Sequence, residues 1–207
     1  MTRLDFRLGF EPCSGLHTTG DRVELWVDKA LALDWKKEPI VPATSIKGWM
    51  RENAERVLRA LGKPVCDGSK PPNSCDCQIC KVFGHPRRKS HLFFLDGTLE
   101  EALKDSRTNV SLSRHRKTSY EERLFASEIA WAQRLVVRGF GFFPDDGEAR
   151  KAAAVLWLSA RAGFALGSSR SRGLGWLKLR DFEFKCNGES ISEENLKELV
   201  RALGGEA

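Results

Sequence analysis

The order in which apolar periodicity changes along the chain constrains its fold more than any other feature. Leu4, Phe6, Leu8 and Phe10 alternate with charged residues and glycine, which is typical of a half-buried strand. The later patterns are a helical stripe over 45–61, strands over 92–99 and 127–143, a second helix over 147–162 and a strand over 174–185. The order strand, helix, strand, strand, helix, strand predicts an α+β, ferredoxin-like fold.

Irregularities in these patterns predict local features. Shifts of apolar parity predict β-bulges near Gly139 and between Leu179 and Phe182. Ser190 with Glu193 predicts a capping box for a final helix over about 190–204.

The 207 residues fit a single domain, 1–207, with two additions to its core. We expect the core to comprise about 1–63, 92–103 and 124–186. A loop-like insertion covers about 64–91. Residues 104–123 are polar and basic without a large apolar cluster, so they predict an arm that projects from the body.

Charge and hydropathy narrow the expected partners and compartment. The net charge of +6 and the pI near 9.1 favour a polyanionic partner, most simply nucleic acid. The sequence has no run of 18 apolar residues that could cross a membrane, and its first ten residues lack the apolar stretch of a signal peptide. We therefore expect a cytoplasmic protein whose six cysteines do not form disulfides.

A glycine-rich loop over 167–176 is the strongest candidate ligand site. Glycine lets the backbone approach a ligand closely, successive N–H groups form a concave anion site, and arginine forks fit phosphate. The composition therefore favours a loop that holds a phosphate backbone, although many glycine-rich loops are plain turns. The candidate phosphate-binding residues are Gly167, Ser168, Ser169, Arg170, Ser171, Arg172 and Gly173.

The start of the first helix is a second candidate phosphate site. Thr44 or Ser45 is expected to cap this helix, and its free N–H groups and positive dipole end would attract an anion beside Lys47. Arg51 follows one turn later and could contact the next phosphate. The alternative is an ordinary capped helix with no ligand.

Two residues between the first strand and the first helix are candidates for chemistry. His17, in the glycine-bracketed loop 15–20, could act as a general base or contact RNA, but a hydrogen-bonded structural histidine is the favoured interpretation. Asp28 could hold Mg²⁺ for RNA cleavage, although most single carboxylates are solvated surface groups.

Four cysteines within 15 residues predict a structural zinc site. Cys66, Cys75, Cys77 and Cys80 have short spacings, and thiolates bind zinc tetrahedrally. His85 and His91 are spare ligands. A closed four-ligand site has no open position, so no catalysis is assigned to it. The other two cysteines, Cys13 and Cys186, are interpreted as core or interface thiols.

Five short segments form an ordered set that covers nearly the whole chain, from Arg3 to about Phe184. They are residues 15–17, 40–48, 77–84, the pair Leu124 and Phe125 with Glu128, and 166–175. In this order they resemble the RAMP superfamily, specifically the backbone subunit of type III CRISPR RNA-guided effector complexes.

The resemblance implies a modified ferredoxin-like (RNA-recognition-like) fold, with a protruding thumb hairpin formed by the 104–123 arm. The zinc-binding insertion expected from the cysteines is added to this fold. The resemblance also implies guide RNA, complementary target RNA, other subunits of the complex and stacked copies of the same chain as partners. Arg107 and Arg114 of the arm are expected to contact RNA. By its position before residues 40–48, Asp28 corresponds to the aspartate with which cleaving relatives cut target RNA. Residues 29–31 and 42–45 depart from the family pattern around that site.

Three other functions remain open at this point. The chain could be a non-cleaving structural or capping subunit of the same complex. It could be a stand-alone CRISPR-RNA-processing endoribonuclease that uses His17 or His115. Outside the family, it could be a zinc-stabilised module that binds protein.

Overall fold

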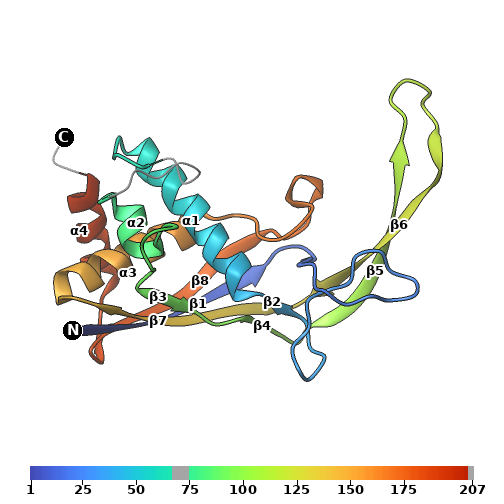
Figure 1. Cartoon of the computed structure of the whole chain (residues 1–207). Helices are drawn as coiled ribbons and strands as arrows, with labels where there is room; N and C mark the ends of the chain where they lie inside the picture. The colour runs from blue at the N-terminus through green and yellow to red at the C-terminus, as the bar shows by residue number, and fades with distance from the viewer. Residues whose placement is uncertain (67–74, 205–207) are drawn as a thin grey trace.

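The computed structural model describes residues 1–66 and 75–204, and it is a mixed α/β structure with antiparallel sheets (Figure 1). The part of the cysteine insertion at 67–74 lies outside the described residues. The elements in chain order are β1 (Thr2–Pro12), β2 (Ile40–Val41), α1 (Ala43–Ala60), α2 (Gln78–Phe83), β3 (Leu92–Phe94), β4 (Gly97–Glu100), β5 (Leu103–Leu112), β6 (Ser119–Trp131), β7 (Arg134–Phe143), α3 (Asp146–Ala162), the 3-10 turn η1 (Arg170–Arg172), β8 (Leu177–Cys186), β9 (Glu189–Ser190) and α4 (Glu193–Gly204).

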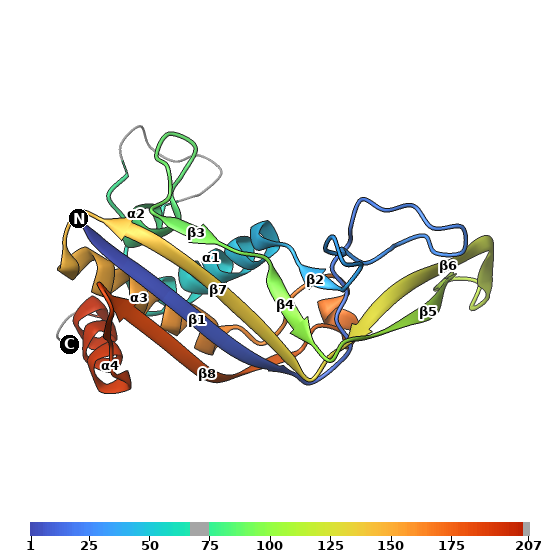
Figure 2. The ribbon, with the colours of Figure 1, turned by 90° about the horizontal axis from the view of Figure 1, so that it is seen from below.

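The main sheet has the order β2-β4-β7-β1-β8-β9, and β3 also pairs with β7. Its four central strands, β4-β7-β1-β8, are antiparallel and are compatible with the expected ferredoxin-like fold. The helices lie on one face of this sheet (Figure 1), and Figure 2 shows the opposite face in front of them. We call this uncovered side the open sheet face.

The core lies between the sheet and the helices. Leu4, Phe6, Leu8 and Phe10 of β1 all point inward and are buried, which confirms the alternation expected from the sequence. They pack with the apolar faces of α1 and α3. Because α3 places several alanines on its buried face, it can approach β1 and α1 closely.

One of the two expected bulges is present. The pairing of β1 with β8 shifts between Gly9 and Phe10, which leaves Arg180 without a direct partner and confirms the bulge between Leu179 and Phe182. The prediction of a bulge near Gly139 is wrong, because β1 and β7 pair without interruption. Gly139 points inward instead, where a β-carbon would collide with the Phe6 ring.

The expected helix caps are also corrected. Neither Thr44 nor Ser45 caps α1, because Pro42 is the N-cap residue and has no side-chain cap. The Asp96 carboxylate accepts the Ala43 N–H at 2.7 Å instead, from the break between β3 and β4. The capping residue expected at α4 is corrected in the same way. Ser190 lies in β9, and the Oγ atom of Ser192 accepts a backbone N–H of α4 instead.

The projecting arm is a β-hairpin formed by β5 and β6, and it continues past the expected 104–123 to Trp131. The strand-like stretch over 127–143 is therefore two strands, which separate at residues 132–133. Figures 1 and 2 both show the hairpin extending from one end of the main sheet. Among the helices of the described residues, none has the length and hydropathy of a membrane span.

Candidate nucleic-acid interface and metal centre

The glycine-rich loop interlocks with the 15–20 loop that follows β1. The Ser168 N–H donates to the His17 carbonyl oxygen at 2.8 Å, and the Gly175 N–H donates to the Gly15 carbonyl oxygen at 2.8 Å. Gly167 has a φ of 92° and lies against the same His17 carbonyl, where a β-carbon would collide with it. The glycines of the sequence motif therefore allow two loops, far apart in the chain, to approach each other backbone to backbone.

Between these anchors, residues 168–173 form an exposed turn. η1 is a single 3-10 turn flanked by Ser169 and Gly173, both in the left-handed conformation. Within the described chain, the N–H groups of Ser169 and Ser171 donate no hydrogen bond. The turn therefore presents donors and hydroxyl groups to solvent, as expected for a loop that contacts an anion.

Two hollows share Ser168 as a lining residue. The first joins the glycine-rich loop to the base of the hairpin. Its basic residues come from three segments of the chain, and no acidic side chain of the described residues lines it. It is lined by His17, Lys29, Arg107, Asn109, Phe125, Ser127, Ile129, Ser168, Ser169, Arg172 and Leu174.

The second hollow joins the glycine-rich loop to the first turns of α1. Arg170 reaches into this area but forms an ion pair with Glu52 at 3.1 Å, so its charge is partly neutralised. The lining residues are Thr18, Thr19, Ser45, Trp49, Glu52, Leu166, Gly167, Ser168 and Arg170. We call the two hollows together the loop groove.

His17 is a structural residue. It is 2% exposed, its Nδ1 atom lies 2.6 Å from the Glu128 carbonyl oxygen, and its Nε2 atom lies 2.9 Å from the Thr19 hydroxyl. Because both ring nitrogens already have hydrogen-bond partners, the geometry favours the structural alternative and gives no support to a general base. The contact of His17 with RNA stays a prediction.

Glu128 holds the loop before α1 against the hairpin. Its carboxylate accepts the Arg22 guanidinium at 2.6 Å and the Leu31 N–H at 2.8 Å, while its own N–H donates to the Lys29 carbonyl at 3.0 Å. Reasoning from the sequence assigned this residue no role beyond its place in a motif. A glutamate among apolar residues in a strand was the only signal that could have identified it.

Asp28 lies on the same loop, beside β6. Its carboxylate accepts the Ala126 N–H at 2.8 Å, and its own N–H donates to the Ala126 carbonyl at 3.0 Å. The side chain is exposed. It belongs to no group of three or more possible metal ligands in the described parts of the chain. The role of Asp28 in cleavage stays a prediction.

The start of α1 does not present the expected row of free N–H groups. The Ala43 N–H is bound by Asp96, and the Ser45 and Ile46 N–H groups donate to the Pro42 carbonyl. Of the three side chains expected to bind phosphate here, only Ser45 lines the loop groove.

The other two, Lys47 and Arg51, are half-buried on α1 and do not line the loop groove. Burial lowers the pKa of Lys47, and the nearby Arg51 charge lowers it further. Arg51 donates to the Glu55 carboxylate at 2.8 Å and to the Gly84 carbonyl at 2.9 Å, so it ties α1 to the end of α2. Their contact with RNA stays a prediction without support from this geometry.

The two arginines expected to bind RNA on the hairpin lie in different places. Arg107 lines the loop groove at the hairpin base. Arg114 lies in the turn at the hairpin tip, where it is exposed. Val110 and Leu112 are also exposed along the hairpin. The hairpin thus offers basic side chains at both ends and apolar ones between them.

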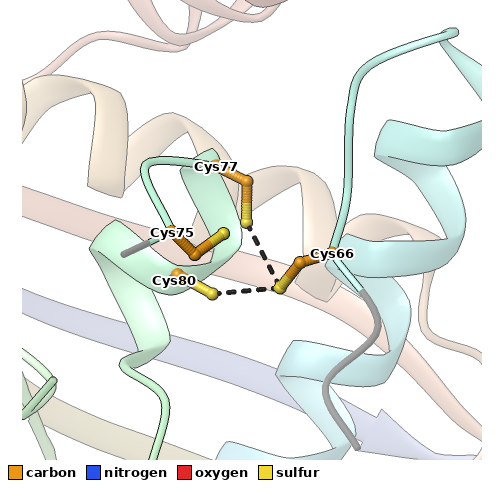
Figure 3. Close-up of side chains that lie close together, drawn as sticks. All are labelled: Cys66, Cys75, Cys77 and Cys80. Carbon is orange, nitrogen blue, oxygen red and sulfur yellow. Dashed lines mark hydrogen bonds between the residues drawn. The ribbon is translucent and has the colours of Figure 1, made fainter. Parts of the chain in front are cut away.

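The four cysteines meet at the start of α2 (Figure 3). Their sulfur atoms all lie within 4.8 Å of one another, with Cys66 3.2 Å from Cys80 and 3.7 Å from Cys77. A tetrahedral zinc site holds its sulfur atoms about 3.8 Å apart, so the arrangement fits the metal. Neither His85 nor His91 belongs to this cluster.

The acidity of the thiols differs across the cluster. Burial raises the pKa of Cys80, and the neighbouring thiols raise it further. Burial also opposes ionisation of Cys77, but backbone hydrogen bonds at Cys66 and Cys80 and the adjacent thiols outweigh it and lower the pKa to about 7. One thiolate is therefore favoured at neutral pH, which is the form that binds a metal.

The remaining cysteines lie elsewhere. Cys186 is buried in the core, whereas Cys13 is exposed, so only the first matches the expectation of a core thiol. Residues 10–178 match the family model described as the RAMP superfamily. A search of curated proteins finds no match to the chain.

Proposed function

Because this chain belongs to the RAMP superfamily, we propose that it is the guide-RNA-binding backbone subunit of a type III CRISPR effector complex. Membership implies a CRISPR-associated RNA-binding protein. The finer role is our proposal, and it rests on the loop groove.

The observation that carries the proposal is the first hollow of that groove. Lys29, Arg107 and Arg172 come from three separate segments and line one depression that, in the described part of the chain, has no acidic side chain. An RNA phosphate there would meet three cations together with the exposed donors of the 168–173 turn. Such contacts position a strand without reading its sequence, which leaves recognition to base pairing between guide and target.

The hairpin supplies the second part of the proposal. It extends from the main sheet (Figure 2), its residue Arg107 lines the groove, and Val110 and Leu112 are exposed on it. We assign it the role of a thumb that wedges between base pairs of the guide–target duplex and turns one target nucleotide outward. The cysteine cluster would hold a structural zinc that stabilises the insertion before β3.

Whether the subunit cuts its target rests on Asp28. In the cleaving form, this carboxylate would bind Mg²⁺ at the target backbone close to the displaced nucleotide. The non-cleaving alternative is favoured by a specific observation, since the Asp28 carboxylate already accepts the Ala126 N–H and, among the described residues, belongs to no cluster of metal-binding side chains.

RNA binding is tested by the salt dependence of affinity. Each phosphate of single-stranded RNA that a cation neutralises adds about 0.7 to the steepness of log K against log salt, so Arg107→Ala with Arg172→Ala should reduce the steepness by about 1.4. The matched control is Arg59→Ala with Arg201→Ala, which removes the same charge from exposed sites on α1 and α4. An equal slope for the groove variant and wild type would reject the groove as the binding site.

Cutting is tested on RNA complementary to the guide that co-purifies from nuclease-free preparations. Asp28→Ala should abolish Mg²⁺-dependent cleavage by the assembled complex and leave guide binding unchanged. Intact cleavage by this variant would remove Asp28 from the site. A wild-type complex that binds but never cuts would establish the structural subunit instead.

A further inference from the structure

The loop over residues 21–28, which we call the apolar loop, carries three almost fully exposed apolar side chains close together in the chain. Val23, Leu25 and Trp26 are 94%, 91% and 87% exposed. They surround a tight turn in which Val27 bridges to Glu24. Soluble proteins seldom expose such a group without a binding partner for it.

The apolar loop is held in place before any partner arrives. Arg22 binds Glu128 at its beginning, and the Asp28 backbone pairs with Ala126 at its end. The Gly20 N–H donates to the Ala30 carbonyl and closes the base of the loop. A loop fixed in this way loses little conformational entropy on binding, which favours recognition by its tip.

The open sheet face is the second unpartnered surface. Phe93 and Phe140 stack there at 5.2 Å, and the Arg3 guanidinium lies 5.5 Å from the centre of the Phe140 ring. Leu95 and Arg138 border the same depression. Within the described residues, Arg138 forms no ion pair. Aromatic residues and arginine together are typical of the centre of a protein interface.

The two surfaces are complementary in chemistry. The apolar loop carries Asp21 and Glu24 against the single Arg22, whose charge is shared between Glu24 and Glu128. Asp28, at the end of the loop, is kept for the target RNA by the proposed function. The depression on the open sheet face has four cations against two carboxylates, with apolar side chains between them. Its charged residues are Arg3, Arg7, Arg138, Lys185, Asp5 and Glu183. Three of the cations are already paired, Arg3 with Asp5, Arg7 with Asp181 and Lys185 with Glu183, so among the described residues Arg138 is the cation available to a partner.

The two surfaces lie at opposite ends of the molecule. The apolar loop pairs with the hairpin, whereas the aromatic residues lie where β3 pairs with β7, toward the N-terminus in Figure 2. One copy therefore cannot bring its own two surfaces together. A contact between two different surfaces of identical chains is head-to-tail and can extend without closing.

We propose that the apolar loop of one copy docks on the open sheet face of the next copy, so that this pair of surfaces joins neighbouring subunits. This deepens the proposed function, on which it rests, by assigning the residues of the subunit-to-subunit contact. The negative charge of the loop favours a protein surface over RNA as its partner. Because the docked area is small, a shared RNA strand that raises the local concentration of copies should strengthen the contact.

The test measures cooperative loading on single-stranded RNA, with oligonucleotides that accommodate one copy or two. Leu25→Ser with Trp26→Ser should leave one-copy affinity unchanged and weaken binding of the second copy by about 30-fold, as for removal of an interface tryptophan. Trp35→Ser is the matched control, because this exposed tryptophan lies on the separate turn 34–38. It should retain cooperative loading.

Complementation identifies the two surfaces. Arg138→Glu alters the open sheet face at an exposed, unpaired residue, so it should fold and yet lose cooperativity. A loop variant mixed with a sheet variant should form one pair through the two intact surfaces and no larger species by native mass spectrometry. Two loop variants should form no pair.

The other outcomes overturn the proposal. Cooperativity retained by both variants, or a wild type that loads no second copy, would show that these surfaces do not join. Weaker one-copy affinity in Arg138→Glu would show that the open sheet face binds RNA instead. If the wild type binds no RNA at all, the proposed function fails, and the docking is judged on the protein alone by sedimentation at high concentration.

Discussion

Replacing Glu128 with alanine should release the loop before α1 from the hairpin. The carboxylate is 16% exposed and accepts two charge-assisted hydrogen bonds, from Arg22 at 2.6 Å and from the Leu31 N–H at 2.8 Å. In Glu128→Ala, the Arg22 guanidinium and the Leu31 N–H both lose this hydrogen-bond acceptor. The same loop carries Asp28, so its release would also disturb the candidate cleavage site.

The size of the effect follows from these two hydrogen bonds. A hydrogen bond to a charged group contributes about 1.5–3 kcal/mol. Because Arg22 is one-third exposed, solvent screens its pair, which then contributes about 0.5–1 kcal/mol. We expect the free energy that holds the loop closed to fall by about 2–4 kcal/mol in Glu128→Ala. The loss should be about 1–2 kcal/mol in Glu128→Gln, which keeps one neutral acceptor.

Amide hydrogen exchange distinguishes local release from global unfolding. The amides of Gly20, Asp28 and Leu31 should exchange about 30-fold faster or more in Glu128→Ala, since about 2 kcal/mol favours the closed loop. Amides in α3 should keep their wild-type rates. Glu121→Ala, which removes an exposed carboxylate from the same strand, is the control. Unchanged exchange of the three loop amides would refute the role of Glu128.

The remaining predictions concern the metal cluster and the glycine-rich loop. Cys80→Ser should lower the zinc content from about one ion per chain and should also lower the melting temperature. Cys13→Ser, outside the cluster, should change neither quantity. Elemental analysis measures the zinc content, and thermal unfolding measures the melting temperature. In metal-free protein, the rate of Cys77 alkylation should rise as pH increases through about 7, because the lowered pKa of Cys77 makes the thiolate dominant above that pH. Mass spectrometry at a series of pH values measures this rate. A midpoint near pH 9 would contradict the lowered pKa. Gly175→Ala should destabilise the fold by several kcal/mol more than Gly173→Ala, as measured by urea unfolding. Both glycines have a positive φ, but only the β-carbon added at position 175 would collide with the Leu166 carbonyl. Equal losses of stability would show that the interlocked loops relax.

Local patterns in the sequence were sufficient for much of the fold. The alternation of Leu4 to Phe10 predicts a half-buried strand because side chains alternate across any strand. The cluster from Cys66 to Cys80 predicts a metal site because short spacings keep the thiols near one another in almost any loop. The glycines of the 167–176 motif likewise indicate close backbone contacts without showing what they contact.

Only the tertiary structure decided which distant residues meet. It brought Arg172, Arg107 and Lys29 to one hollow, and it gave Asp96 the capping role expected of Thr44 or Ser45. It also gave both ring nitrogens of His17 a hydrogen-bond partner. Local propensity acts over a few neighbouring residues, whereas a hydrogen bond or a shared hollow depends on where the whole backbone returns. The sequence by itself therefore determined the main helices and strands and the cysteine cluster, and the packing of loops against the hairpin decided the groove.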